Sequence, residues 1–253
     1  MELKKVLVIT YYWPPSGGGG VQRWLKFIKY LPDFGWEPIV FTPENPDFSL
    51  QDNTLQKDVS PDLEVIRFPI WEPFGVYKKL FKSSGKTVKQ GIVIEKSKLT
   101  FGDKISIWIR ANLFIPDPRV FWVKPSAKFL ESVIHDNDIG LVITTGPPHS
   151  MHLIGKRLKK TTGVKWIADF RDPWSDWDVL EKMKISSLAH SVHRNLERKV
   201  MKHCDLVLTV SNRLANSFIE KQHSLNVQVV NNVVDEDDFI LPEPSSKDLK
   251  FRI

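Results

Sequence analysis

The hydrophobic and polar positions along the chain alternate between two kinds of segment. Short, β-branched apolar runs are followed by turns rich in Gly, Pro or Asn, and then by stretches with apolar residues at helical spacing. Continuous apolar runs are typical of strands that are buried on both faces, so the pattern predicts an α/β fold with a doubly wound parallel sheet flanked by helices. The expected strands lie at residues 6–9, 38–41, 63–66, 140–143, 164–168, 206–208 and 227–230.

The first predicted helix has an apolar side and a charged side. Arg23, Lys26 and Lys29 lie opposite the apolar positions, which predicts an amphipathic helix. The apolar positions are Val21, Trp24, Leu25, Ile28 and Leu31.

Four later helices are also expected. Pro125 suits the first turn of one, and a second begins near His149. A third is marked by apolar residues every four positions from Leu188 to Val200, and Ser211 is expected to cap the fourth.

Residues 71–118 interrupt this alternation with interleaved lysines and aromatic residues. We interpret the segment as an insertion of one or two helices outside the central sheet. Between Trp71 and Arg110 it carries nine basic and three acidic residues, a net charge of +6 that equals the excess of the whole chain. The segment favours an anionic membrane surface as a partner, although a solvated insertion without a partner explains the same pattern. The basic residues are Lys78, Lys79, Lys82, Lys86, Lys89, Lys96, Lys98, Lys104 and Arg110.

Length and composition narrow the class of protein. The 253 residues, of which 42% are hydrophobic and 26% charged, fit an ordinary globular protein and exclude disordered and disulfide-rich classes. We predict one domain over residues 1–240, with 241–253 as a linker and the start of a second domain. The single cysteine, Cys204, lies beside an apolar strand and is expected in the core, in a reducing compartment. No apolar run approaches the roughly 20 residues of a membrane span, so we expect a cytoplasmic protein.

Four loops at the expected carboxyl ends of the strands carry candidate chemistry, because ligands bind at that edge of such sheets. Gly17, Gly18, Gly19 and Gly20 let backbone N–H groups approach a phosphate or sugar; a flexible turn without a ligand is the alternative. His149 begins a helix at a point from which its ring could face the crevice, although a lone histidine more often caps or packs.

The third loop, Asp169 to Trp177, combines three carboxylates, a guanidinium and two indoles that suit hydroxyls, phosphates and sugar rings. An ion pair between Arg171 and an aspartate that braces the loop is compatible with that role. The fourth loop, Asn231 to Asp235, is by itself only a turn, although Asn amides can bond hydroxyl groups. We find no His/Cys cluster at metal-ligand spacing, and neither Ser16 nor Ser150 has the setting of an activated nucleophile.

Taken in order, these segments resemble the N-terminal domain of family 4 glycosyltransferases. The resemblance rests on residues 6–20, 145–150, 168–174, 205–211 and 231–235, and it leaves out the 71–118 insertion. It implies one Rossmann-like half of a two-domain GT-B enzyme, which transfers a sugar from a nucleotide-sugar donor to a glycan or lipid-linked acceptor. The transfer would retain the sugar's configuration and need no essential metal.

The same resemblance assigns roles to particular residues. Gly17 to Gly20 would approach the donor phosphates, and His149, Asp169, Arg171 and Asp172 would surround the acceptor and the sugar. Many family members have a histidine after the fifth strand, where this chain has Asp-Phe-Arg-Asp, so the residue that takes over its role stays open. Nucleotide recognition belongs to the second domain, and we therefore expect this polypeptide alone to be inactive or nearly so.

Two other classes of function are weighed against this one. An NAD-dependent dehydrogenase shares the fold, but the glycine spacing does not give G-x-G-x-x-G, and Glu44 comes late for an acidic residue that ends the second strand. A non-catalytic module that binds a membrane surface or a protein partner is supported by the basic segment. Nucleic acid is not expected as a partner, because no recognised motif accompanies that segment.

Overall fold

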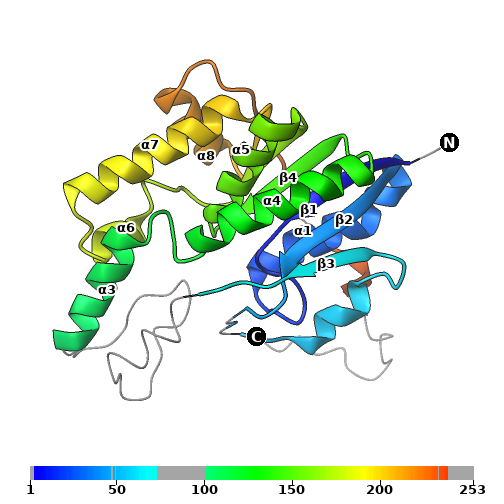
Figure 1. Cartoon of the computed structure of the whole chain (residues 1–253), viewed down its shortest axis with the longest axis horizontal. Helices are drawn as coiled ribbons and strands as arrows, with labels where there is room; N and C mark the ends of the chain where they lie inside the picture. Colours follow the sequence, from blue (N-terminus) through cyan, green and yellow to red (C-terminus); the bar gives the residue numbers. More distant parts are fainter. Residues whose placement is uncertain (1–2, 47, 49, 73–100, 233, 239–253) are drawn as a thin grey trace, which may run out of the picture.

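A computed structural model describes residues 3–46, 48, 50–72, 101–232 and 234–238. Its centre is a seven-stranded sheet in the order β3-β2-β1-β4-β5-β6-β7, in which every neighbouring pair is parallel (Figure 1). The strands are β1 (Lys4–Ile9), β2 (Trp36–Pro43), β3 (Glu64–Phe68), β4 (Leu141–Gly146), β5 (Lys165–Phe170), β6 (Leu206–Thr209) and β7 (Val227–Val229).

This topology confirms the predicted α/β class and all seven predicted strands. The order in which strands are added to the sheet reverses between β1 and β4. β2 and β3 lie on one side of β1, whereas β4 and the later strands lie on the other side. In such sheets this reversal opens a crevice at the carboxyl ends of the strands. The loops after β1 and β4 therefore meet at the position where a ligand is expected.

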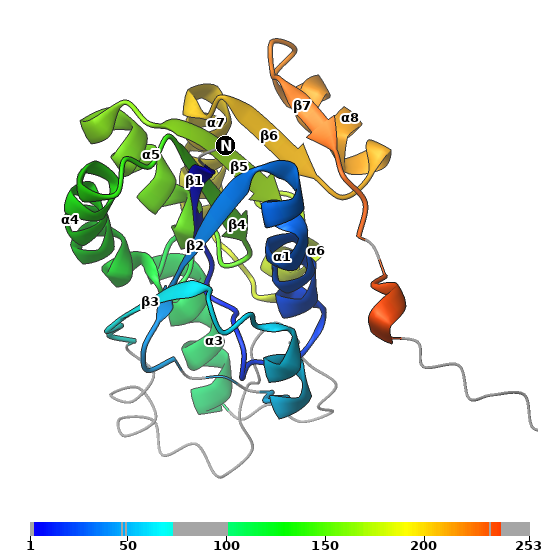
Figure 2. The ribbon, with the colours of Figure 1, turned by 90° about the vertical axis from the view of Figure 1, so that its right-hand side faces the viewer.

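The helices cover both faces of the sheet. α1 packs on one face, where Val21, Trp24 and Leu25 join a cluster with Val6 and Val8 (Figure 2). α4, α5 and α7 lie on the opposite face, over a larger cluster that includes Trp122, Ile154 and Val200. The helices are α1 (Gly19–Tyr30), α3 (Phe101–Leu113), α4 (Val120–Asp136), α5 (Ser150–Thr162), α6 (Asp178–Lys182), α7 (Ser187–His203) and α8 (Asn212–Lys221), with short 3-10 turns η1 (Leu31–Phe34), η2 (Asn53–Asp58) and η3 (Glu236–Asp238).

Two local predictions meet different outcomes. Ser211 caps α8 as expected, because its side chain accepts a hydrogen bond from the Leu214 N–H. The prediction for Pro125 was wrong: α4 begins at Val120, so Pro125 lies inside the helix rather than in its first turn. Proline has no N–H to donate to the carbonyl four residues earlier in the helix. Because Pro125 lies on the exposed side of α4, water can donate to that carbonyl instead.

An ion pair connects the start of the 71–118 insertion to the residue that follows its end. Arg119 Nε lies 2.8 Å from a Glu72 carboxylate oxygen, and the Tyr11 hydroxyl contacts both side chains. The insertion adds no strand to the sheet within the described residues; α3 is its one described helix and packs near α6 and α7 through Ile107, Ala111 and Met183. Residues 73–100, with seven of the nine basic residues, lie outside the described part, as does the predicted linker at 241–253.

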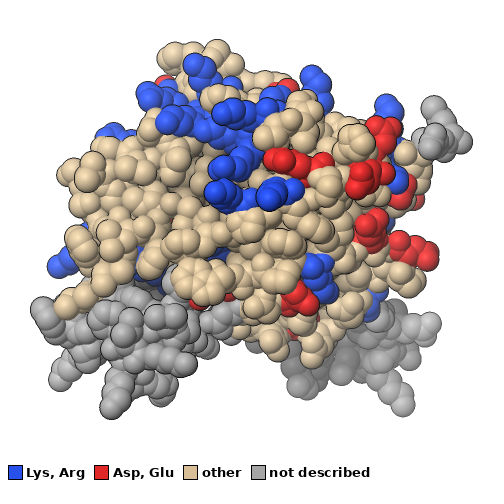
Figure 3. All heavy atoms as spheres, viewed as in Figure 1, with Lys and Arg blue, Asp and Glu red and all other residues tan. Residues whose placement is uncertain are grey.

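The face formed by α4, α5 and α7 carries many of the exposed basic side chains (Figure 3). In the part of the chain that the structure describes, no helix combines the length and the apolar character needed to cross a membrane. Cys204 is partly buried beside β6, and burial raises the pKa of its thiol to about 12.

Candidate site at the carboxyl edge of the sheet

The loops after β1, β4 and β5 are tied together by one side chain. Arg171 donates three hydrogen bonds to backbone carbonyls: from Nη1 to Gly20 at 2.7 Å, from Nη2 to Pro147 at 2.6 Å and from Nε to Gly146 at 3.2 Å. Burial lowers the pKa of the guanidinium, against the opposing charges of Asp169 and Asp172. The structure thus brings the predicted site residues of three loops to one edge, with Arg171 as the brace between them.

The four glycines before α1 have different surroundings. Gly17 lies against the 50–52 segment, where a Cβ would stand 3.0 Å from the Asp52 Cβ, and its N–H donates to the Leu50 carbonyl at 3.0 Å. That N–H is therefore already bonded, which removes it from the groups that can hold a phosphate. Gly18 has a φ of 94°, a conformation that side chains rarely allow, and forms the start of α1.

Gly19 and Gly20 form the first turn of α1, and this turn is open. The helix has no side-chain cap and no acidic residue in its first turn. No atom lies within 4 Å of a Cβ built on Gly19, whereas a Cβ on Gly20 would meet Arg171 Nη1 at 2.8 Å. Since the first N–H groups of a helix have no partner within the helix, this terminus offers donors and partial positive charge to an anion.

Asp169 is part of the scaffold rather than of the crevice surface. Its side chain is fully buried and accepts hydrogen bonds from Trp24 Nε1 at 2.7 Å and from Thr145 Oγ1 at 2.9 Å. Arg23 Nη2 lies 3.1 Å from its other oxygen. Because its oxygens are occupied and shielded, Asp169 serves the scaffold in this structure, and its expected contact with sugar or acceptor stays a prediction. The predicted ion pair with Arg171 is absent, since Arg23 is the partner.

Asp172, three residues later, has a different environment. It is half-buried and makes no hydrogen bond or ion pair with the residues that the structure describes. Burial raises the pKa of its carboxyl, and the charge of Arg171 partly offsets that rise. Asp172 is therefore the carboxylate of this loop that remains available to a ligand hydroxyl.

His149 stands at the start of α5 and packs against Trp174. The two rings are parallel, with an interplanar angle of 1° and 4.7 Å between centroids. His149 is only 5% exposed, and neither ring nitrogen has a hydrogen-bond partner among the described residues. Burial, with the neighbouring His152, His193 and Arg171, lowers the pKa of His149 well below its ordinary value, so the ring is neutral at neutral pH.

The start of α5 is occupied by a carboxylate that the sequence did not indicate. Asp117 accepts hydrogen bonds from the Ser150 N–H and hydroxyl, both at 2.9 Å. Tyr12, also missed, contacts the same region: a Cβ on Gly20 would lie 3.5 Å from its ring. Burial raises the pKa of the Tyr12 hydroxyl, which keeps it protonated as a hydrogen-bond donor.

The charged side of α1 does not face solvent as predicted. Arg23 and Lys26 are 5% and 4% exposed, because the chain after β7 returns across this side of the helix. Arg23 Nη1 donates to the Val230 carbonyl at 2.8 Å and to Asn232 Oδ1 at 3.1 Å. This contact uses the Asn232 oxygen within the protein, and the fourth candidate loop becomes part of the scaffold.

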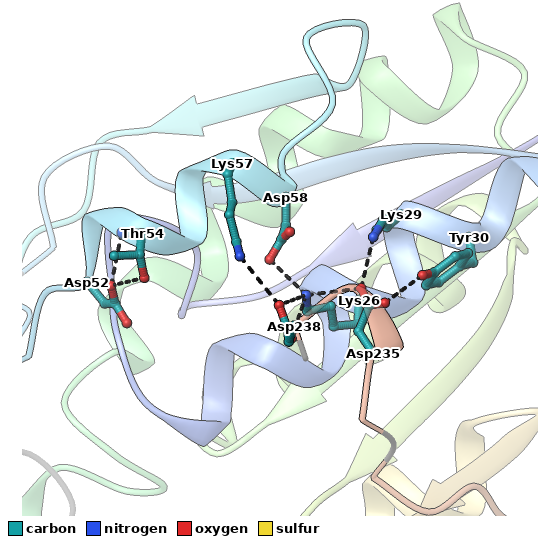
Figure 4. A network of polar contacts seen from close by, with 9 residues as sticks. All are labelled: Lys26, Lys29, Tyr30, Asp52, Thr54, Lys57, Asp58, Asp235 and Asp238. Atoms are coloured by element: carbon teal, nitrogen blue, oxygen red, sulfur yellow. Dashed lines mark hydrogen bonds and ion pairs between the residues drawn. The ribbon is translucent and has the colours of Figure 1, made fainter. Parts of the chain in front are cut away.

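Lys26 is the centre of a second anchor for the same segment (Figure 4). Its Nζ lies 2.9 Å from Asp58, 3.0 Å from Asp235 and 2.8 Å from Asp238. Burial alone would lower the pKa of Lys26, but hydrogen bonds to the three carboxylates outweigh it and leave the pKa raised. Lys29 and Tyr30 also bond Asp235, so α1 holds the chain after β7 along its length.

Two further structural observations concern other kinds of site. A pocket of about 640 Å³ lined by Trp13, Lys57 and Leu63 also includes Glu37 and Pro38, which begin β2. It therefore lies toward the amino ends of the strands and away from the candidate site. Among the described side chains, no group of three or more His, Cys, Asp or Glu residues is arranged to hold a metal ion.

Neither known protein families nor curated proteins match this sequence. Among solved structures, the chain is similar to sucrose-phosphate synthase from Thermosynechococcus elongatus, with a TM-score of 0.53 and 13% identity over 90% of this chain and 48% of that one. Others are a glycosyltransferase from Rickettsia africae (TM-score 0.45, 15% identity, 94% and 45% covered) and MurG from Acinetobacter baumannii (0.47, 11%, 92% and 47%). The chain thus spans about half the length of these proteins, and it has the Rossmann-like α/β fold expected for one half of a GT-B protein.

Proposed function

We propose that this chain is the acceptor-side half of a family 4 glycosyltransferase that uses a nucleotide-sugar donor and retains the sugar's configuration. The observation that carries the proposal is the open first turn of α1 at the crevice, with Arg171 beside it and the half-buried Asp172 next along the chain. The similarity in fold to one half of sucrose-phosphate synthase supports it. The expected contribution of a second domain to nucleotide recognition belongs to the same proposal.

The open terminus supplies what the departing group needs. When the bond between the sugar and the nucleoside diphosphate breaks, negative charge develops on the phosphate oxygens. The N–H groups of Gly19 and Gly20 and the dipole of α1 would stabilise that charge without moving, because Arg171 fixes the turn through the Gly20 carbonyl. Gly19 allows this approach, since the space beside its Cα is empty.

We assign Asp172 and His149 to the sugar and acceptor side. Asp172 can accept a hydrogen bond from a hydroxyl group, because no side chain of the described residues occupies its oxygens. His149 is neutral and carries unpartnered nitrogens, so a hydroxyl that reached it would be bonded without loss of another contact. Neither role requires a metal ion, in keeping with the expectation for the family.

The test is a kinetic comparison in the full-length protein, with a panel of nucleotide sugars as donors. We expect Asp172→Asn to lower kcat by roughly 100-fold, the size typical of a lost contact to a group that becomes charged or oriented in the transition state. Asp178→Asn is the matched control, because Asp178 is an exposed aspartate in the first turn of α6. Donor turnover that is the same in wild type and Asp172→Asn would remove Asp172 from the site, and no turnover with any donor would overturn the proposed function.

A further inference from the structure

The charge of this protein is distributed differently in space than along the sequence. The sequence places the net excess in the 71–110 segment, with the remainder balanced. In the structure, the charges of the rest of the chain are unevenly distributed. α5 and α7 together carry eight basic residues and one acidic residue, Glu197. The eight are Lys156, Arg157, Lys159, Lys160, Arg194, Arg198, Lys199 and Lys202.

Most of these cations are not neutralised within the protein. Lys159 pairs with Asp205, and Glu197 is buried and pairs with Lys221 of α8. The other seven make no ion pair with the described residues. Desolvation lowers the pKa of Lys156, and the positive charges of Lys199 and Lys160 lower it further, which shows that lysines of the two helices lie close together.

The cations form one continuous face. α5 packs against both α4 and α7, and all three helices lie on the same side of the sheet (Figure 1). Figure 3 shows Lys and Arg side chains gathered across this side. We call the outward surface of α5 and α7 the basic face. Charges this close together attract an anionic surface more strongly than isolated lysines do.

α7 adds an apolar line to the basic face. Leu188 is 78% exposed and Val192 is 38% exposed, because the side of α7 that packs inward is formed by Ala189, His193 and Val200. Positions 188, 192, 195, 199 and 202 are spaced by three or four residues and therefore follow one side of the helix. This side begins with two aliphatic residues and ends with Lys199 and Lys202.

We propose that the basic face binds the surface of an anionic phospholipid bilayer, with the lysines at the head groups and Leu188 and Val192 at the acyl boundary. Exposed aliphatic residues in line with lysines are the pattern of helices that lie on membranes. Single-stranded nucleic acid is disfavoured, because neither α5 nor α7 contains a Phe, Tyr or Trp on which bases could stack. The binding is independent of the proposed transfer reaction, and it differs in location from the predicted contact through residues 71–110.

The experiment is sedimentation of the protein with vesicles of phosphatidylcholine alone, or with about 30% phosphatidylglycerol as a fraction typical of anionic bilayers. We expect binding only to the anionic vesicles, with loss as the salt concentration rises. The triple variant Lys156→Gln, Lys199→Gln and Lys202→Gln should bind roughly 100-fold more weakly, since each lysine near such a surface contributes a factor of about five. The control is Lys4→Gln, Lys165→Gln and Lys182→Gln, which removes the same charge from exposed positions elsewhere and should bind within about twofold of wild type.

Two further variants separate the alternatives. Leu188→Ser with Val192→Ser should leave the salt dependence in place but weaken binding roughly tenfold, because aliphatic contact is lost. If Lys78→Gln, Lys79→Gln and Lys82→Gln abolish binding while the basic-face triple variant binds like wild type, the contact lies in the 71–110 segment and the inference is wrong. It is equally wrong if the wild type binds no anionic vesicles, or binds an RNA duplex and not vesicles.

Discussion

Two helices, α1 and α5, begin at the crevice. A side chain caps the first turn of α5, whereas the first turn of α1 has no side-chain cap. The Asp117 carboxylate closes the start of α5 by accepting from the Ser150 N–H and hydroxyl. The start of α1 has no side-chain cap and no acid, and the residue there is Gly18 with a φ of 94°. With glycine at the N-cap, the lack of a capping side chain costs only about a few tenths of a kcal/mol, so the fold carries the open terminus of α1 at a small cost in stability. Such a cost is common where a ligand completes the site.

The surroundings of the two termini sharpen this contrast. Around α1, the polar side chains of Arg23, Lys26, Lys29 and Tyr30 are bonded to β5, to Asp58 of η2 or to the segment after β7. The opening is thus confined to the first turn, and the rest of the helix is fixed. A site needs this combination, because donors that do not move stabilise charge without a cost of reorganisation.

The largest effect is expected from Asp169→Asn, which removes the anchor that places α1 against β5. Arg23 would keep its charge in a buried site without a counterion, and breaking a buried pair in this way typically costs about 3–5 kcal/mol. Urea denaturation of the variant should show this loss of unfolding free energy. Asp172→Asn in the same loop is the comparison and should change stability by no more than about 0.5 kcal/mol. Similar losses in the two variants would show that the burial of Asp169 has been misjudged.

Next in size is Asp117→Ala, which would make the start of α5 as open as that of α1. We expect a loss of about 1–2 kcal/mol, because one cap and its charge at the helix terminus are removed together. Asp117→Asn keeps the acceptor oxygen and should recover part of this loss. Thermal denaturation measures both variants, and no change in either would mean that water replaces the cap at no cost.

A smaller and sharper comparison uses two neighbouring glycines. In Gly20→Ala the new Cβ would stand 2.8 Å from Arg171 Nη1, so the guanidinium must shift from the Gly20 carbonyl, at a cost of about 1 kcal/mol. In Gly19→Ala the Cβ enters empty space, and alanine's helix propensity should stabilise the fold by up to about 1 kcal/mol. Chemical denaturation measures the change in unfolding free energy for both variants. Changes of opposite sign would locate the brace at Gly20, whereas changes of the same sign would contradict this packing.

The sequence predicted the sheet because each strand is a local, continuous apolar run, and burial on both faces follows from that run alone. It misplaced Arg23 and Lys26 because their partners, Asp169 and Asp238, are 146 and 212 residues away, and helical periodicity carries no information about a chain segment that returns. Of the proposed site residues, the structure leaves Asp172, Gly19 and Gly20 accessible and takes Asp169 into the scaffold. Asp117 was missed because it lies at the end of the insertion, 33 residues before the helix that it caps.

The smallest effect on stability, with the most information about function, is expected from Gly19→Asp. An acidic side chain in the first turn would complete α1 in the manner of α5, and favourable interaction with the helix dipole should add about 0.3–1 kcal/mol to the unfolding free energy. The same charge would occupy the place proposed for the donor phosphates, so KM for the nucleotide sugar should rise while the fold becomes more stable. Gly19→Asn has nearly the same shape without the charge, and its KM should lie between those of wild type and Gly19→Asp. A more stable variant with unchanged donor kinetics would show that the open terminus of α1 serves something other than phosphate binding.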